Sequence, residues 1–289
     1  KVTKLLPHIF PERQYASGFF ADSTKVIVDW IKKDTTVEAD ADRGGNIGWE
    51  CRNCVLFSDA SNASKAGAFV PGIAGSMSRF AIVGNYLYTV NQYSLGIQDI
   101  TTPTDPVNRG VAQIGMNIET IYPLKEKLFI GSSGGMFIYD ISNPSLPTPQ
   151  GSFSHARACD PVVADDDYAF VTLRSGTFCQ GTNNQLDVIN VKNVMSPTLV
   201  KTYSMSNPHG LAKDGNLLFV CDGKAGLKLY ETSNVNNLKL IRTIPGMDAF
   251  DVIAWDKKLL LVASNGLYQF DYSNRDDIRL ISTIAINRK

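Results

Sequence analysis

The stretch "GMFIYDISNP" at 135–144 shows the pattern on which the whole chain is built. A glycine is followed by a short apolar run, an acid and a turn-forming Asn-Pro, which is typical of a buried strand that ends at a tight turn. The same shape returns as "LGIQDITTP" at 95–103 and, more loosely, as "NGLYQFDYSN" at 265–274. This recurrence indicates an internal repeat, which decides the fold before any local structure does.

The period of the repeat can be measured at the acidic or polar residue that follows each apolar run. These residues are Asp59, Asp99, Asp140, Asn190, Glu231 and Asp271. Their successive separations are 40, 41, 50, 41 and 40 residues, and the one long interval contains the insertion "GTFCQGTNNQ" at 176–185.

A second series of apolar runs lies upstream of the first and includes "NYLYTV" at 85–90, "DYAFVT" at 167–172 and "NLLFVC" at 216–221. Their β-branched, aromatic and leucine residues indicate buried strands. With the segments between them, each unit offers four short strands, which is typical of a β-propeller blade of about 40 residues. Two β-sandwiches would also explain short strands, but they would not explain the fixed period. We therefore predict an all-β fold, a β-propeller of four-stranded blades with six complete repeats.

We expect residues 1–289 to form a single propeller domain. Its repeats are expected at about 15–76, 77–115, 116–156, 157–206, 207–245 and 246–286. Residues 1–9, "KVTKLLPHI", are similar to the fourth strands of later units and read as the last strand of a preceding blade. The expectation is therefore that a further unit is encoded upstream and that the intact ring has seven or eight blades.

The units resemble the LVIVD-repeat family of bacterial β-propellers. The resemblance rests on the glycine, the apolar run and the "D-I-S-N-P" that follows it, on the "N-Y-L-Y" strand before it, and on the apolar fourth strand. It covers about residues 15–286 and is specific for the fold. Members of this family are largely uncharacterised and are often secreted or surface-anchored lipoproteins. The resemblance therefore implies an extracytoplasmic location, in the periplasm or at the outer-membrane surface.

A polar position recurs near the start of the expected first strands, which line the channel of a propeller. It is found twelve residues before the end of each second strand, at Glu119, Asp160, His209 and Asp251 among others. Three carboxylates and an imidazole could bind a divalent cation or act as acid and base. Alternatively, these residues cap strand ends and bond to backbone groups or channel water.

The insertions at about 31–53 and 174–185 should lie at this same end of the blades, where His155 and Arg157 also fall. A face that collects long loops is the more probable ligand-binding face. Cys159 and Cys179 are expected to meet there in a disulfide, since both belong to one blade. Cys51 and Cys54 form a CxxC for which a local disulfide is favoured over a zinc site. Cys221 ends a second strand and should be a buried free thiol.

Composition and motifs limit the possible functions. The 28 basic and 28 acidic residues balance, so there is no general electrostatic attraction to nucleic acid. The sequence contains no apolar run of about 18 residues, the length needed for a membrane-spanning helix. We therefore expect association with a membrane only through a lipid anchor.

No nucleophile elbow, P-loop or HExxH motif is found. We expect an extracytoplasmic binding or scaffolding propeller that holds a protein, glycan or small molecule on the loop-rich face. The alternative is a metal-assisted hydrolase or lyase that uses the polar ring at the channel mouth.

Overall fold

The computed structural model describes residues 75–154, 161–175 and 183–286. The twenty strands in these residues form five four-stranded antiparallel sheets, and the strands of each sheet are paired in chain order. Each sheet is called a blade here, numbered 1 to 5 along the chain.

The bounds of the strands follow the repeat. Blade 1 consists of β1 (Phe80–Val83), β2 (Tyr86–Val90), β3 (Ser94–Asp99) and β4 (Val107–Gln113). Blade 2 consists of β5 (Ile118–Leu124), β6 (Lys127–Ser132), β7 (Gly135–Asp140) and β8 (Thr148–Ser154). Blade 3 consists of β9 (Val162–Ala164), β10 (Tyr168–Leu173), β11 (Gln185–Asn190) and β12 (Thr198–Ser204). Blade 4 consists of β13 (Leu211–Asp214), β14 (Leu217–Cys221), β15 (Leu227–Glu231) and β16 (Lys239–Ile244). Blade 5 consists of β17 (Ala249–Trp255), β18 (Lys258–Ala263), β19 (Gly266–Asp271) and β20 (Arg279–Ala285).

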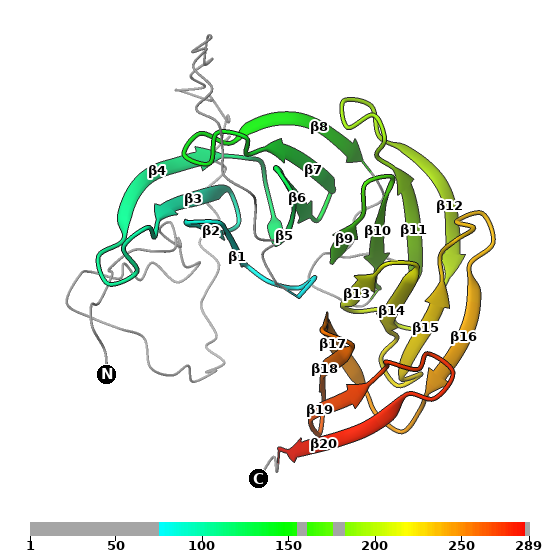
Figure 1. Ribbon diagram of the computed structural model, residues 1–289. Helices are drawn as coiled ribbons and strands as arrows, with labels where there is room; N and C mark the ends of the chain where they lie inside the picture. Colours follow the sequence, from blue (N-terminus) through cyan, green and yellow to red (C-terminus); the bar gives the residue numbers. More distant parts are fainter. Residues whose placement is uncertain (1–74, 155–160, 176–182, 287–289) are drawn as a thin grey trace, which may run out of the picture. The chain divides into compact units, whose positions relative to one another are not determined.

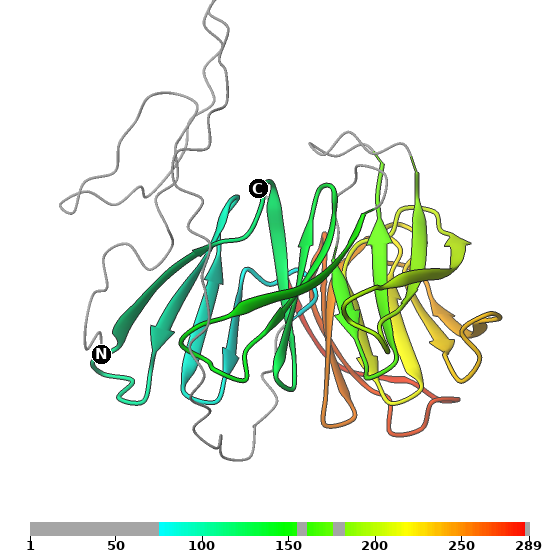
Figure 2. The same ribbon diagram turned by 90° about the horizontal axis from the view of Figure 1, so that it is seen from above.

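The blades are arranged around a common axis, as in a β-propeller. The first strand of each blade lies on the inner side and the fourth on the outer side (Figure 1), and Figure 2 shows the blades from above as adjoining twisted sheets. The first strands of successive blades contact one another, from β1 with β5 to β13 with β17. The prediction of an all-β propeller with four-stranded antiparallel blades is therefore confirmed.

The number of blades differs from the prediction. Five blades are described, one fewer than the six complete repeats expected, and they fall within the expected repeats from 77–115 to 246–286. The first expected repeat, about 15–76, lies outside the described residues except for residues 75 and 76, and so does the expected strand at 1–9. No further blade that would make a ring of seven or eight is seen in the described part of the chain.

The hydrophobic core lies between successive blades. Because side chains alternate along a strand, one blade packs on two neighbours. In β14, Leu218 and Val220 join the cluster shared with blade 3, whereas Phe219 and Cys221 join the cluster shared with blade 5. Cys221 is a buried free thiol, as predicted. Four such clusters join the five blades.

The recurrent acid has a local structural role at the end of the third strand in blades 1, 2 and 5. Asp99 Oδ1 accepts hydrogen bonds from the backbone N (2.9 Å) and the hydroxyl (2.7 Å) of Thr101. Asp140 and Asp271 accept the same pair from Ser142 and Ser273. Side chains of this kind stabilise turns by bonding to the backbone two residues on. The repeat seen in the sequence is therefore first of all a turn signal.

The residue after the acid adds a second recurrent contact. Its backbone N donates to a carbonyl in the turn between the first and second strands of the same blade. The five bonds join Ile100 to Asn85, Ile141 to Glu126, Val191 to Asp167, Thr232 to Asn216 and Tyr272 to Lys257, at 2.7–3.0 Å. Both turns at this end of a blade are thus held together.

Within the described residues, no helix is long and apolar enough to cross a membrane.

Candidate functional site

Three of the four residues expected at the channel mouth are described, and all lie near the start of a first strand. Glu119 is the second residue of β5, His209 precedes β13 by two residues, and Asp251 is the third residue of β17. The remaining residues of the expected site are outside the described residues and stay predictions. They are Asp160, His155, Arg157, Cys51, Cys54, Cys159 and Cys179.

The strand register decides which of these positions are equivalent. The corresponding pairs of first and second strands are Ile121–Ile130, Leu211–Val220 and Val252–Leu261. Two residues earlier in each blade stand Glu119, His209 and Phe250. Asp251 is therefore one residue away from the equivalent position. The sequence-based count started from Ala263 as the end of the second strand of this blade. The residue equivalent to Gly131 and Cys221, the strand ends used in the other two blades, is Val262.

Arg174, which the sequence reasoning missed, joins two of the expected residues. Its Nη1 lies 2.9 Å from Nδ1 and 3.1 Å from Nε2 of His209. The positive charge of Arg174 also lowers the pKa of Glu119, as does the charge of Arg79. Arg174 stands just after β10, where the 174–185 insertion begins, and this position at the loop-rich end was the one signal that could have found it.

His209 is held in place from several sides and is only 6% exposed. Its carbonyl accepts a hydrogen bond from Thr172 Oγ1 (2.6 Å), its Nε2 lies 3.2 Å from Nδ2 of Asn207, and its ring packs 5.2 Å from that of Phe250. Burial, and then the charge of Arg174, lower the pKa of His209 to about 4. The imidazole is therefore neutral at pH 7 and accepts a hydrogen bond from the guanidinium.

Glu119 and Arg174 share a partly buried environment. Burial raises the pKa of Glu119, while the positive charges of Arg79 and Arg174 oppose that rise. Burial likewise lowers the pKa of Arg174, against the effect of Glu119. Arg79, Glu119, Arg174 and His209 are called the mouth cluster here. It combines two guanidinium cations, one carboxyl group and one neutral imidazole.

Asp251 belongs to a different, enclosed environment. Its Oδ1 accepts hydrogen bonds from Val252 N (2.9 Å) and Ser76 Oγ (3.4 Å), and Ser76 Oγ in turn accepts from Leu211 N at 2.7 Å. A Cβ added at Gly210 would collide with the carboxylate of Asp251. Burial raises the pKa of Asp251 to about 6, against these two hydrogen bonds. We assign this carboxyl to the packing of β17.

Ser78 occupies the position in blade 1 that is equivalent to Glu119 in blade 2. It makes the kind of local contact at a strand end that was the alternative to ligand binding for these polar residues. Its Oγ donates to the carbonyl of Phe80 at 2.6 Å, a local contact at the start of a strand. Among the described residues, no three His, Cys, Asp or Glu side chains are grouped to hold a metal ion. A divalent cation at the channel mouth stays a prediction, because Asp160 lies outside these residues.

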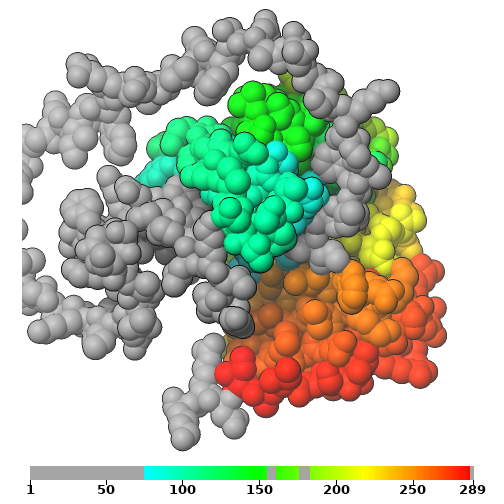
Figure 3. Space-filling model, turned by 60° about the vertical axis from the view of Figure 1, so that its left-hand side comes forward, coloured from blue at the N-terminus to red at the C-terminus, as the bar shows by residue number. Residues whose placement is uncertain are grey.

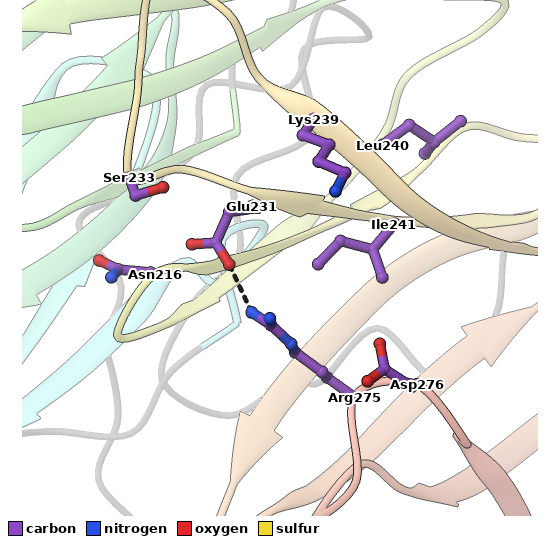
Figure 4. Close-up of a pocket in the computed structure, with 8 residues that line it drawn as sticks. All are labelled: Asn216, Glu231, Ser233, Lys239, Leu240, Ile241, Arg275 and Asp276. Atoms are coloured by element: carbon purple, nitrogen blue, oxygen red, sulfur yellow. Dashed lines mark hydrogen bonds and ion pairs between the residues drawn. The ribbon is translucent and has the colours of Figure 1, made fainter.

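A surface pocket of about 550 Å³ lies between blades 4 and 5 (Figure 4). It is at the end of the blades opposite the mouth cluster, because Asn216 and Arg275 lie in turns at that end. Its lining consists of Asn216, Glu231, Ser233, Lys239, Leu240, Ile241, Arg275 and Asp276. In the pocket, Arg275 Nη1 and Glu231 Oε2 form an ion pair at 2.5 Å. Arg242, which does not line the pocket, donates from Nη1 to the carbonyl of Asp276 at 2.8 Å. These contacts tie the outer part of blade 4 to the loop after β19, so the pocket borders an inter-blade contact.

The fold defines this chain as a β-propeller. The family model for the LVIVD repeat matches residues 74–111 and 128–154, which cover blade 1 and most of blade 2. The resemblance to LVIVD repeats that was read from the sequence is therefore confirmed over these residues.

Solved structures extend the likeness in fold. A functionally unknown protein from Desulfotomaculum acetoxidans is 9% identical, with a TM-score of 0.58 over 75% of this chain and 70% of that one. A protein from Lactobacillus plantarum is 13% identical, with a TM-score of 0.55 over 70% and 73% of the two chains. The periplasmic gluconolactonase of Pseudomonas aeruginosa is 14% identical, with a TM-score of 0.53 over 70% and 68%. At such identities the likeness shows the fold alone. No curated protein matches the sequence.

Proposed function

We propose that this protein is a binding propeller whose mouth cluster holds a carboxylate of a small molecule or of a partner. The position of Arg174 carries the proposal. A guanidinium presents its donors in a planar fork that matches a carboxylate, and Arg174 is half-buried and fixed by a neutral His209. Arg79 adds a second cation, so the mouth cluster has a net positive charge when Glu119 is ionised.

The charge of Glu119 allows the proposal to predict in which direction the affinity for a ligand changes when this charge is removed. A carboxylate ligand is repelled by an ionised Glu119 and attracted by Arg174. Removing the charge of Glu119 should therefore strengthen the binding of an anion, whereas it would weaken the binding of a cation. A sugar that uses Glu119 as a hydrogen-bond acceptor would also bind more weakly after the change.

The test is calorimetric titration of the full chain with a panel of small carboxylates and sugar acids, and with matched neutral sugars. Arg174→Ala should abolish binding of the anion that binds the wild type, and Glu119→Gln should tighten it. Arg109→Ala is a control, because Arg109 forms an exposed pair with Asp99 on the outer strand of blade 1. Unchanged binding in Arg174→Ala, or weaker binding in Glu119→Gln, would contradict the proposal.

The wider setting is part of the same proposal. The extracytoplasmic location, at the periplasm or the outer-membrane surface, is supported by the LVIVD resemblance, and a protein or glycan on the loop-rich face would be a second kind of partner. The balanced charge of the chain argues against nucleic acid. Residues of about 15–76 are proposed as the first of six repeats, in place of the ring of seven or eight blades expected from the sequence. No observation on the described residues favours the alternative function, a metal-assisted hydrolase or lyase.

A further inference from the structure

The two terminal blades each expose a face that is buried in every other blade. On one side of blade 1, Phe80 pairs with Thr89 and Ile82 pairs with Leu87. Phe80 and Ile82 are exposed on this side, whereas Thr89 is buried. Phe80 is 49% exposed. The strand register makes it equivalent to four fully buried residues in the other blades. They are Ile121, Val162, Leu211 and Val252.

Blade 5 exposes the opposite side of its sheet. Leu260 is 38% exposed, whereas the equivalent residues of the other blades are at most 1% exposed. These are Tyr88, Phe129, Phe170 and Phe219. Val262, on the same side, is also exposed, whereas its equivalent Cys221 is fully buried.

The outer strand of blade 5 shows the same contrast. Ile284 is 65% exposed, whereas its equivalents pack against the cluster that joins their blade to the next one. These equivalents are Ala112, Phe153, Tyr203 and Ile244. In each described inter-blade cluster, therefore, the position of Ile284 belongs to the contact with the following blade.

These two surfaces have the composition of inter-blade core. Contiguous exposed apolar surface on a folded protein marks an interaction site, and in a repeat architecture each unit buries its apolar faces on its neighbours. Both terminal blades are visible in Figure 3, blade 1 in blue-green and blade 5 in orange to red.

The chain that leads into blade 1 already lies against the open face of blade 5. Asp251 pairs with Val262, and Ile253 pairs with Leu260, so all four share this face. Ser76 Oγ donates to Asp251, and a Cβ at Gly75 would come within 3.4 Å of Cγ1 of Ile253. The described chain thus begins at the inner end of the open face of blade 5 and continues into blade 1.

We propose that residues before Gly75 supply one further blade, which packs on the open face of blade 5 and on the open face of blade 1. The 74 residues that precede Gly75 exceed the roughly 40 that one blade requires. They contain "KVIVDW" at 25–30 and "CVLFSDASN" at 54–62, the two kinds of apolar run that mark the second and third strands elsewhere. The occupant of both faces is therefore this chain itself.

Hydroxyl-radical footprinting of the full chain tests the proposal directly, with mass spectrometry to read the oxidation of each peptide. Phe80, Leu260 and Ile284 should be oxidised several-fold more slowly than their exposure in the described blades would give. Leu240 is the matched control, since it is 48% exposed at an outer-strand position that is also exposed in blade 5. Fast oxidation of Phe80 and Leu260, equal to that of Leu240, would overturn the proposal.

Two further measurements identify the occupant. Light scattering should show a monomer, because a dimer that protects the faces would make a second copy the occupant. Ile27→Asp, in the run 25–30, should raise the oxidation of both Phe80 and Leu260 while leaving Leu240 unchanged. Protection that persists in this variant, or that is lost on only one of the two faces, would contradict a single closing blade. Because the mouth-cluster titration reads a different region, failure of one proposal leaves the other standing.

Discussion

Replacing Asp251 with asparagine should stabilise the protein at neutral pH. Burial raises the pKa of this carboxyl from 3.8 to about 6. An acid whose pKa is raised in the folded state contributes stability that is fully present below its unfolded value, near 3.8, and that is lost as the pH rises through about 6. Each unit of pKa corresponds to about 1.4 kcal/mol. Ionised Asp251 therefore costs the folded protein at most about 3 kcal/mol above pH 6.

Asparagine keeps the contacts that the carboxylate makes. Its Oδ1 can accept the same hydrogen bonds from Val252 N and Ser76 Oγ, and its volume is almost the same as that of aspartate. Its amide protons require a new acceptor or water, which offsets part of the gain. We expect a net increase of about 1–3 kcal/mol in the free energy of unfolding at pH 7.5, and almost none at pH 4.

Urea denaturation of wild type and Asp251→Asn at pH 4, 5, 6 and 7.5 measures this difference. Asp105→Asn is the control, because it removes one negative charge at an exposed position in the turn after β3. The difference between Asp251→Asn and wild type should grow between pH 4 and pH 6 and then stay constant. A variant that is less stable than wild type at pH 7.5, or a difference that does not depend on pH, would refute the reasoning.

Four further predictions concern substitutions at single positions. The pKa of His209 is lowered to about 4, so the wild type should lose stability as the pH falls from about 6.5 to 4, by at most about 3 kcal/mol, and His209→Gln should flatten this part of the pH profile in thermal melts. Gly226→Ala should cost about 2–4 kcal/mol in urea denaturation, because Gly226 has φ of +87° and its added Cβ would collide with a carbonyl of β16. Gly215→Ala should cost only about 1 kcal/mol, because Gly215 also has positive φ but has open space around it. Tyr88→Phe should cost about 1 kcal/mol in the same assay, because the buried hydroxyl of Tyr88 donates to a backbone carbonyl of blade 2 at 2.8 Å, and an unchanged stability would show that this bond contributes nothing.

The fold could be predicted because its signal is local and repeated. The acid that ends a third strand, as at Asp99 and Asp140, stabilises a turn by accepting hydrogen bonds from the residue two positions on. Such contacts need only a short stretch of chain, so they leave a regular mark in the sequence. The period of that mark was sufficient to predict four-stranded blades.

The site was predicted less completely because it depends on the strand register. An apolar run shows that a strand is buried but not which residue pairs with which, and the run 258–263 extends one position further than the true equivalent of the earlier strands. Asp251 was therefore placed beside Glu119 and His209 in the ring. Arg174 was missed because its approach to His209 joins blade 3 to blade 4, a contact between residues 35 positions apart that no local pattern indicates.

In every described blade, a backbone hydrogen bond joins the turn between the first and second strands to the turn after the third strand. These bonds bear on how far the loops at the opposite end of the blade can vary in length. Each blade fixes its own hairpins through a backbone contact such as that of Ile100 with Asn85, which depends on no particular side chain. At the mouth end, backbone bonds join the turn between the second and third strands to the fourth strand or to the next blade, as from Met205 N to Asn184 O and from Ala249 N to Gly223 O. The 174–185 insertion is accommodated at this end without disturbing the pairing of β10 with β11. Foreign loops could therefore be grafted between second and third strands of this scaffold, with the spacing of the blades left intact.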